Sequence, residues 1–172
     1  MSTEESGGPI VGRRIVLRRA VEEDAPAFRE ALATPEVARW WVWPNMMAEL
    51  AAEDHTVLAV TLEDRVIGMV QWYEEPDPDY RHAGMDLFLH PDFQGRGLGG
   101  DTVRTMARWL IDERGHHRLV IDPDARNTGA IAVYERCGFR RVGVLRRYWY
   151  DHVTGEWSDG MLLDLLAEEL RG

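Results

Sequence analysis

A glycine-dense loop lies between an apolar, strand-like run and an amphipathic run, and this order constrains the fold of the chain strongly. The apolar run covers residues 85–89, the loop residues 94–100 and the amphipathic run residues 103–111. Glycines let backbone N–H groups approach an anion closely, and the N-terminus of the following helix adds a partial positive charge. The loop lacks the Gly-Lys-Ser/Thr of a Walker A motif and lies too late in the chain for an N-terminal dinucleotide fingerprint. The sequence therefore predicts a pyrophosphate-binding loop of another type.

The spacing Gln-x-x-Gly-x-Gly in this loop resembles motif A of the GCN5-related N-acetyltransferases (GNAT), which holds the pyrophosphate of acetyl coenzyme A (acetyl-CoA). Residues 127–139 are similar to the Asn-x-x-Ala-x-x-x-Tyr-x-x-x-Gly-Phe helix of the same family. The resemblance covers residues 15–165. It implies that acetyl-CoA is the cosubstrate and that its site contains Leu87, Phe88, Leu89, Gln94, Gly95, Arg96, Gly97, Leu98, Gly99, Gly100, Asn127, Ala130 and Tyr134.

Length and composition indicate one globular domain, which we expect to span residues 10–172 after a flexible tail at residues 1–9. The 20 basic residues are all arginines, and with 30 acidic residues they give a net charge of −10. This balance disfavours nucleic acid or an anionic membrane as a partner and suits a cationic substrate. The single cysteine, Cys137, cannot form an internal disulfide, and the start of the chain lacks signal-peptide regions, so we expect a cytoplasmic location.

Hydrophobic periodicity predicts an α/β sandwich with a mixed central sheet of about seven strands flanked by helices, and the GNAT fold matches this order of elements. The expected strands cover residues 14–18, 56–62, 65–73, 83–89, 118–122, 143–150 and 157–165. The expected helices cover residues 22–32, 35–40, 46–54, 99–113 and 128–136. Two prolines and several acids place residues 74–81 in a loop.

Asp86 is the candidate general base. It alternates with Met85, Leu87 and Leu89, so its carboxylate lies on the opposite face of the strand from these apolar side chains. A carboxylate within an interior strand is costly unless it is paired or used in chemistry. The chain resembles most closely the aminoglycoside 6′-N-acetyltransferases, which carry a Gly-x-Asp at this place with the aspartate as base. The alternative is an aspartate that anchors a loop or an arginine.

Other candidate substrate ligands are acidic or aromatic. The same resemblance implies that Asp122, at the end of a buried strand, binds a substrate ammonium; the alternative is a turn residue before Pro123. The acidic residues of the predicted loop at 74–81 form either a rim that attracts cations or simply a solvated face. Asp159 is a candidate for the opposite side of the acceptor cleft. Tryptophans suit sugar rings and cations, although at least one is expected to belong to the core. The predicted substrate site is Trp40, Trp41, Glu74, Glu75, Asp86, Asp122 and Asp159.

Tyr134 follows Ala130 by one helical turn, and its role implied by the resemblance is to donate a proton to the departing CoA thiolate; the alternative is a core tyrosine. Asn127 is expected to bond the pantetheine arm, and an ordinary helix N-cap has the same sequence signature. The histidines lack the spacing of a metal site, so we expect no metal.

The sequence therefore predicts an acetyl-CoA-dependent N-acetyltransferase whose acceptor is a small cationic amine, and the expected acceptor is an aminoglycoside antibiotic. Part of the C-terminal stretch, residues 146–163, looks like the ribosomal type of protein N-terminal acetyltransferase, so that acceptor class stays open, as does a siderophore hydroxylysine. A catalytically silent acyl-CoA-binding domain is the alternative from another class, and the retention of Asp86 and Tyr134 argues against it.

Overall fold

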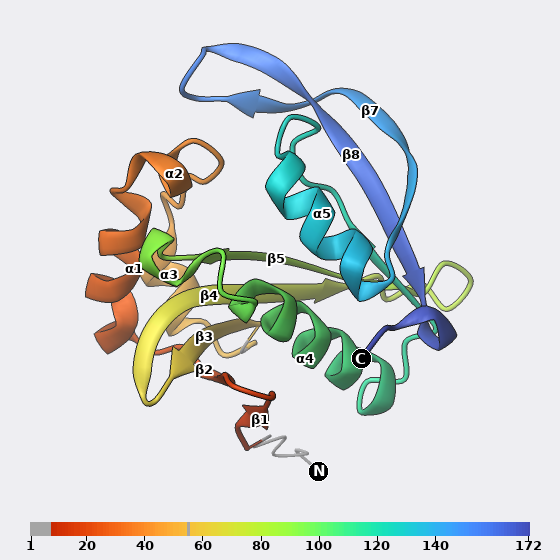
Figure 1. Cartoon of the computed structure of the whole chain (residues 1–172), viewed down its shortest axis with the longest axis horizontal. Coiled ribbons are helices and arrows are strands. Elements are labelled where there is room, and N and C mark those ends of the chain that lie inside the picture. The colour runs from red at the N-terminus through yellow and green to blue at the C-terminus, as the bar shows by residue number, and fades with distance from the viewer. Residues whose placement is uncertain (1–7, 55) are drawn as a thin grey trace.

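The computed structural model describes residues 8–54 and 56–172, and these residues form an eight-stranded sheet with the strand order β1-β2-β3-β4-β5-β6-β8-β7 (Figure 1). The paired strands are antiparallel except for β5 and β6, which are parallel. The strands are β1 Ile10–Val11, β2 Val16–Arg19, β3 Val57–Leu62, β4 Arg65–Glu74, β5 Ala83–Leu89, β6 Arg118–Ile121, β7 Arg140–Asp151 and β8 Glu156–Leu166.

The α/β class and the mixed sheet predicted from sequence are confirmed, and the sheet has eight strands where about seven were expected. The additional strand among the described residues is β1, which pairs Ile10 with Leu17 and is too short to give a periodic signal. The expected tail at residues 1–9 lies outside the described residues except for Gly8 and Pro9. The helices are α1 Ala25–Leu32, α2 Pro35–Ala38, α3 Met46–Ala51, α4 Leu98–Asp112 and α5 Thr128–Cys137, with short 3₁₀ turns at Glu22–Asp24, Pro91–Phe93 and Ala167–Glu169.

The two faces of the sheet carry separate apolar cores. Helices α4 and α5 cover one face, where Leu98 and Met106 pack among the buried side chains of β5, β6 and β8. Helices α1 to α3 cover the other face, where Phe28 and Phe88 lie 6.3 Å apart between ring centroids in an edge-to-face contact. Alternation along β5 divides its side chains between these cores, so Met85 and Leu89 belong to the first core and Phe88 to the second.

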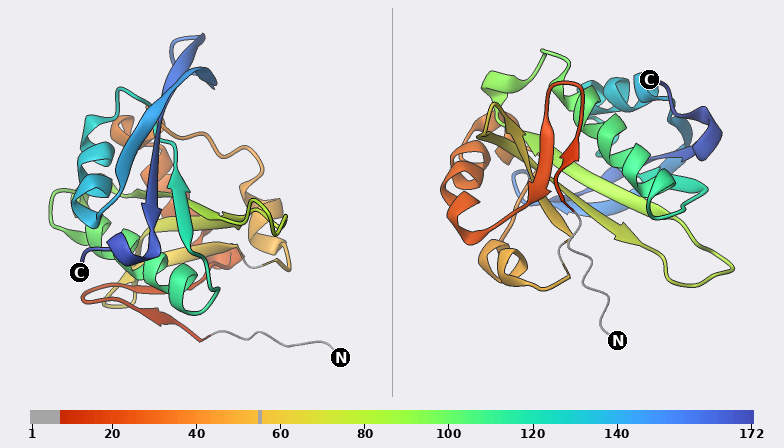
Figure 2. Two further views of the ribbon diagram at one scale, coloured as in Figure 1. Left: turned by 90° about the vertical axis from the view of Figure 1, so that its right-hand side faces the viewer. Right: turned by 90° about the horizontal axis from the view of Figure 1, so that it is seen from below.

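Strands β7 and β8 form a long hairpin whose tip projects beyond the layers of the fold (Figures 1 and 2). Both strands extend further than the sequence predicted. Strand β7 begins at Arg140, directly after Gly138 ends α5 in the left-handed conformation with φ of 112°. Two interruptions of the pairing register, at residues 141–143 and 145–149, make the expected strand signal irregular.

A single carboxylate ties the N-terminal hairpin to the start of α4. Asp101 accepts hydrogen bonds from the backbone N–H groups of Arg13, Arg14 and Ile15 at 3.0, 2.7 and 3.1 Å. The Arg14 guanidinium also donates to the Arg96 carbonyl at 2.8 Å. These contacts fix the turn between β1 and β2 against the glycine loop, and the three donors offset the cost of burying the Asp101 charge.

We expect Asp101→Asn to lower the free energy of unfolding by about 2–3 kcal/mol, because an amide has one acceptor oxygen and presents its NH₂ group to backbone donors. Urea unfolding followed by circular dichroism measures this change. Asp112→Asn, an exposed position on the same helix, is the control and is expected to stay within about 0.5 kcal/mol of the wild type. Equal stability of the two variants would contradict the structural role of Asp101.

Candidate active site

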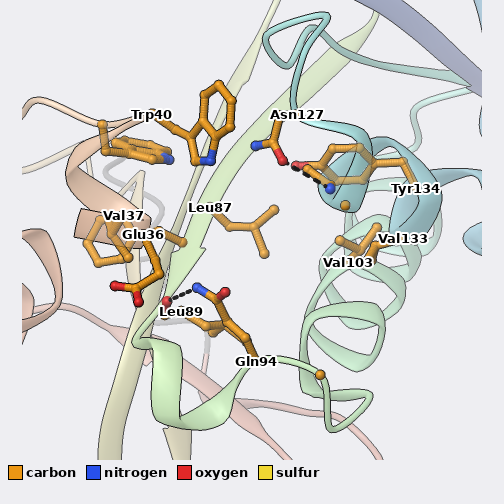
Figure 3. Close-up of a pocket in the computed structure, with 15 residues that line it drawn as sticks. Glu36, Val37, Trp40, Leu87, Leu89, Gln94, Val103, Asn127, Val133 and Tyr134 are labelled. Carbon is orange, nitrogen blue, oxygen red and sulfur yellow. Dashed lines mark hydrogen bonds between the residues drawn. The ribbon is translucent and has the colours of Figure 1, made fainter. Parts of the chain in front are cut away.

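A cavity of about 280 Å³ opens between β5, α2, α5 and the glycine loop (Figure 3). Its wall is largely apolar, with Leu87 and Val103 on one side and Trp40 on the other. Gln94, Asn127 and Tyr134 supply polar groups along the wall. An apolar cleft with a few convergent polar groups is typical of a small-molecule site, and this volume lies near the lower end of such sites.

The cavity exists because the parallel strands β5 and β6 separate. They pair only at Ala83 with Leu119 and at Gly84 with Val120, after which β6 ends and β5 continues to Leu89. The backbone of β5 beyond residue 84 therefore faces the gap instead of another strand on this side. A ligand with amide groups can occupy that gap and pair with the free edge of β5.

The glycine loop begins at the end of β5 and leads directly into α4. Gly95 and Gly97 have φ angles of 69° and 79°, which L-residues rarely adopt. A Cβ at either position would find no protein atom within 4 Å, so the space in front of the loop is open to a ligand. Gln94 fixes the loop by donating from Nε2 to the Leu89 carbonyl at 2.8 Å. Since the first N–H groups of a helix lack intrahelical partners, the start of the 15-residue α4 suits a phosphate group.

Helix α5 carries the second polar side of the cavity. Asn127 caps the helix, its Oδ1 accepting from the Ala130 N–H at 3.2 Å. Tyr134 lies one turn beyond Ala130, buried, with its ring 6.0 Å from that of Phe139, and it lines the cavity. Burial and then the charges of Asp86 and Asp122 raise the pKa of the Tyr134 phenol well above its usual value. The phenol is therefore protonated at neutral pH and available as a proton donor.

Asp86 lies on β5 one residue before the cavity residue Leu87, with its side chain on the opposite face of the strand. Gln71, its cross-strand partner on β4, donates from Nε2 to Oδ2 of Asp86 at 3.3 Å. Burial, followed by the negative charge of Asp122, raises the pKa of Asp86 to about 6, against the lowering effect of the Gln71 hydrogen bond. A carboxylate with such a pKa is ionised at neutral pH and is a stronger base than an ordinary aspartate.

Asp122 follows β6 directly, at the point where the gap opens. Continuing the β5–β6 register past Gly84–Val120 places it level with Asp86 on the neighbouring strand. The hydroxyl of Tyr148, on β7, donates to Oδ2 of Asp122. The charges of Asp86 and Asp122 contribute to a raised pKa of Tyr73 on β4, where burial is the larger cause. The two carboxylates and the two tyrosines therefore belong to one electrostatically coupled group.

The remaining predicted substrate residues lie in different surroundings. Trp40 and Trp41 line the cavity, and Trp41 also packs against Phe88 with ring centroids 5.2 Å apart. Glu74, expected in a loop, is instead the last residue of β4, and its carboxylate binds Arg114 and the His116 ring, the latter at 2.6 Å. These contacts hold the pKa of Glu74 below its usual value, so its charge is already paired.

Two further acids have local backbone roles in the structure. Oε1 of Glu75 accepts from the Asp77 N–H at 3.0 Å, within the exposed loop that follows β4. Oδ1 of Asp159 accepts from the Arg147 N–H at 2.7 Å on the β7–β8 hairpin. Of the predicted substrate residues, the structure thus brings Asp86 and Asp122 together and places the two tryptophans at the neighbouring cavity.

Sequence reasoning missed Gln71, Tyr73 and Tyr148, because each is an ordinary strand residue whose importance depends on cross-strand register. It also missed a buried acidic pair, Asp124 and Asp151, bridged by the Arg126 guanidinium at 2.8 Å to each carboxylate. Arg126 lies over the Trp40 ring at 5.9 Å from its centroid, so this network links the loop before α5, the hairpin and α2. The single available signal was the density of charged residues at 122–126.

Comparison with known proteins agrees with this geometry. Residues 14–140 match the family model described as an acetyltransferase (GNAT) domain. The chain belongs to the GNAT family. It is 29% identical over 155 residues to an aminoglycoside N(6′)-acetyltransferase type 1 of Klebsiella pneumoniae, covering 76% of each chain. This membership makes the protein an acetyl-CoA-dependent acetyltransferase.

Other similarities lie elsewhere in the GNAT family. A [ribosomal protein bS18]-alanine N-acetyltransferase of Salmonella typhimurium (strain LT2) is 40% identical over 67 residues, which are 37% of this chain and 43% of that protein. Among solved structures, Mycobacterium smegmatis RimJ in complex with CoA-disulfide superimposes with a TM-score of 0.81 at 23% identity, covering 96% of this chain and 88% of the other. The fold is therefore the GNAT fold.

Within residues 8–54 and 56–172, no three His, Cys, Asp or Glu side chains come together as a metal site. None of the helices in these same ranges combines the length and the apolar character that crossing a bilayer requires.

We expect Gly97→Val to raise the KM for acetyl-CoA at least about tenfold, because a β-branched residue resists the left-handed backbone and its side chain enters the space in front of the loop. Steady-state kinetics with varied acetyl-CoA measures the effect. Gly115→Val is the matched control: Gly115 has φ of 72° and similar open space, but it follows the opposite end of α4. Similar KM values in both variants would refute a binding role for the loop.

Proposed function

We propose that the protein transfers the acetyl group of acetyl-CoA to an amine of a polycationic acceptor, an aminoglycoside, by direct attack of the amine on the thioester. The observation that carries this proposal is the pair of carboxylates, Asp86 and Asp122, placed level on two strands where the sheet opens beside the apolar cavity. A base and a second anion close to such a cavity suit an ammonium substrate that must lose a proton before it attacks.

The residues present fit acetyl-CoA. The open glycine loop and the start of α4 would hold the pyrophosphate, and Arg96 is exposed beside them. The edge of β5 at Leu87, Phe88 and Leu89 offers backbone hydrogen bonds to the pantetheine arm, with Asn127 and Ala130 on the facing helix. Leu87, Val103 and Val133 form the apolar wall along which the arm would lie. When bound, acetyl-CoA would supply an activated thioester.

The proton transfers can be assigned to two side chains. Asp86, ionised above pH 6, removes a proton from the acceptor ammonium, and the free amine then attacks the thioester carbonyl. Tyr134, protonated at neutral pH, donates a proton as the C–S bond breaks, so the thiol leaves neutral. The acceptor nitrogen loses a second proton as the amide forms; that proton neutralises the tyrosinate, and the proton held by Asp86 passes to solvent. Preorganised positions for both groups reduce the entropic cost of the reaction.

Two observations favour an aminoglycoside as the acceptor: the negative charge of the protein and its similarity to an aminoglycoside acetyltransferase. The protein carries a net charge of −10, to which the acidic loop after β4 contributes Glu75, Asp77 and Asp79. A polycation is attracted to such a surface. The Klebsiella relative, which covers three quarters of both chains, is named for the same acceptor class.

A protein N-terminus is the second candidate acceptor. The Salmonella relative is named for an alanine N-terminus. The long β7–β8 hairpin projects past α5 (Figure 1), and we expect it to contact a peptide beyond its first residue. An N-terminal amine carries one charge, however, and makes less use of two adjacent carboxylates than a polyamine does.

The acceptor class is tested by turnover of acetyl-CoA with kanamycin-class aminoglycosides, polyamines and N-terminal alanine peptides side by side. We expect the aminoglycosides to have the highest kcat/KM. We also expect their KM to rise steeply between about 0.05 and 0.5 M NaCl, because salt screens attraction between exposed charges. Efficient acetylation of peptides without turnover of any aminoglycoside would contradict the proposed acceptor and leave only the GNAT assignment.

Asp86→Asn tests the base. We expect kcat to fall by roughly a hundredfold or more, since an amide cannot accept the proton, while acetyl-CoA affinity is retained. In the wild type, kcat/KM should fall as the pH drops below about 6, because Asp86 becomes protonated and neutral there. This fall at low pH should be absent from the pH profile of the variant's residual activity. Near-wild-type kcat over the whole pH range would assign the base to another group; Asp112→Asn is the control.

A further inference from the structure

Strand β7 contains a bulge that turns one side chain out of the regular ladder. The pairing with β8 shifts between Leu145 and Trp149, and Arg147 has φ of 48°. Oδ1 of Asp159 accepts from the Arg147 N–H at 2.7 Å and so satisfies a backbone donor that the bulge leaves outside the ladder. The left-handed conformation is unfavourable for a non-glycine residue, and bulges of this kind often redirect a side chain next to an active site.

The residue redirected here is Tyr148. Its ring lies over Gly160 of β8, where an added Cβ would meet Cδ1 of the ring at 2.8 Å. The absence of a side chain at residue 160 therefore gives the ring its place. From there the Tyr148 hydroxyl reaches the end of β6 and donates to Oδ2 of Asp122. The bulge, the Asp159 contact and the lack of a side chain at Gly160 together position the Tyr148 hydroxyl for this hydrogen bond.

We propose that Tyr148 is a positioning residue that orients the Asp122 carboxylate toward the acceptor ammonium. This inference rests on the proposed function, in which Asp122 binds the acceptor beside the base Asp86. The hydroxyl occupies Oδ2 and leaves Oδ1 and the remaining lone pairs for the substrate. Tyr148 acts on the acceptor only through Asp122.

Tyr148→Phe removes the hydroxyl and keeps the ring over Gly160. We expect the acceptor KM to rise about three- to tenfold, the equivalent of one hydrogen bond, with kcat and the KM for acetyl-CoA within about twofold of the wild type. The acceptor is the amine of the panel that the wild type acetylates best. Tyr150→Phe is the matched control, because Tyr150 is exposed on the same strand and its ring contacts His152 and Trp157 instead.

A double-mutant cycle separates action through Asp122 from direct contact with the acceptor. In the Asp122→Asn background, Tyr148→Phe should change the acceptor KM by less than about twofold, since the partner of the hydroxyl is gone. Multiplicative effects of the two substitutions would overturn the inference. Gly160→Ala, which forces the ring to move, is expected to raise the acceptor KM in the same direction as Tyr148→Phe.

An acceptor KM that both Tyr148→Phe and Gly160→Ala leave at the wild-type value would overturn the inference while the proposed function stands. If the wild type neither binds nor acetylates any amine of the panel, the proposed function fails and the inference with it. Amine binding is followed by calorimetry in parallel with turnover, so the two failures are distinguishable.

Discussion

The separation of two parallel strands is the constraint on which the site depends. Strands β5 and β6 share two residue pairs and then part, so that one edge of β5 is left without a partner in the middle of a sheet. An open edge within a fold is costly unless something pairs with it. The cavity lies along that edge, and Asp86 and Asp122 flank the point of separation. The cavity and the two carboxylates of the proposed mechanism thus lie at one interruption of the hydrogen-bond ladder.

Placing two carboxylates at this point has opposing effects. Burial and then the negative charge of Asp122 disfavour the ionisation of Asp86, so its pKa rises to about 6. The same repulsion that destabilises the free protein makes Asp86 a better base and makes the pair attractive to a cation. Gln71 donates a hydrogen bond to Asp86 and Tyr148 donates one to Asp122. These bonds offset part of the free-energy cost of placing the two carboxylates together, without neutralising their charge.

Sequence patterns predicted the parts of this fold that depend on local order. The glycine loop, the strand before it and the capped helix starting after Asn127 could be recognised because their signals lie within a few residues of each other. Strand β1 was missed because two residues carry no period, and Glu74 was misplaced because prolines two and four residues later suggested an earlier loop. Tyr148 could not be predicted, since its contact with Asp122 depends on a bulge and on a glycine in the neighbouring strand.

The Asp101 contacts have a consequence for the biosynthesis of the protein. The three backbone donors leave the ribosome 86 to 88 residues before the carboxylate that binds them. The first hairpin therefore emerges without its partner, and the turn between its strands cannot settle until α4 has been made. Because Arg14 also binds the carbonyl of Arg96, the shape of the glycine loop in turn depends on the earliest part of the chain. During translation, the contacts between the N-terminal turn and the glycine loop are thus completed only after the start of α4 has been made.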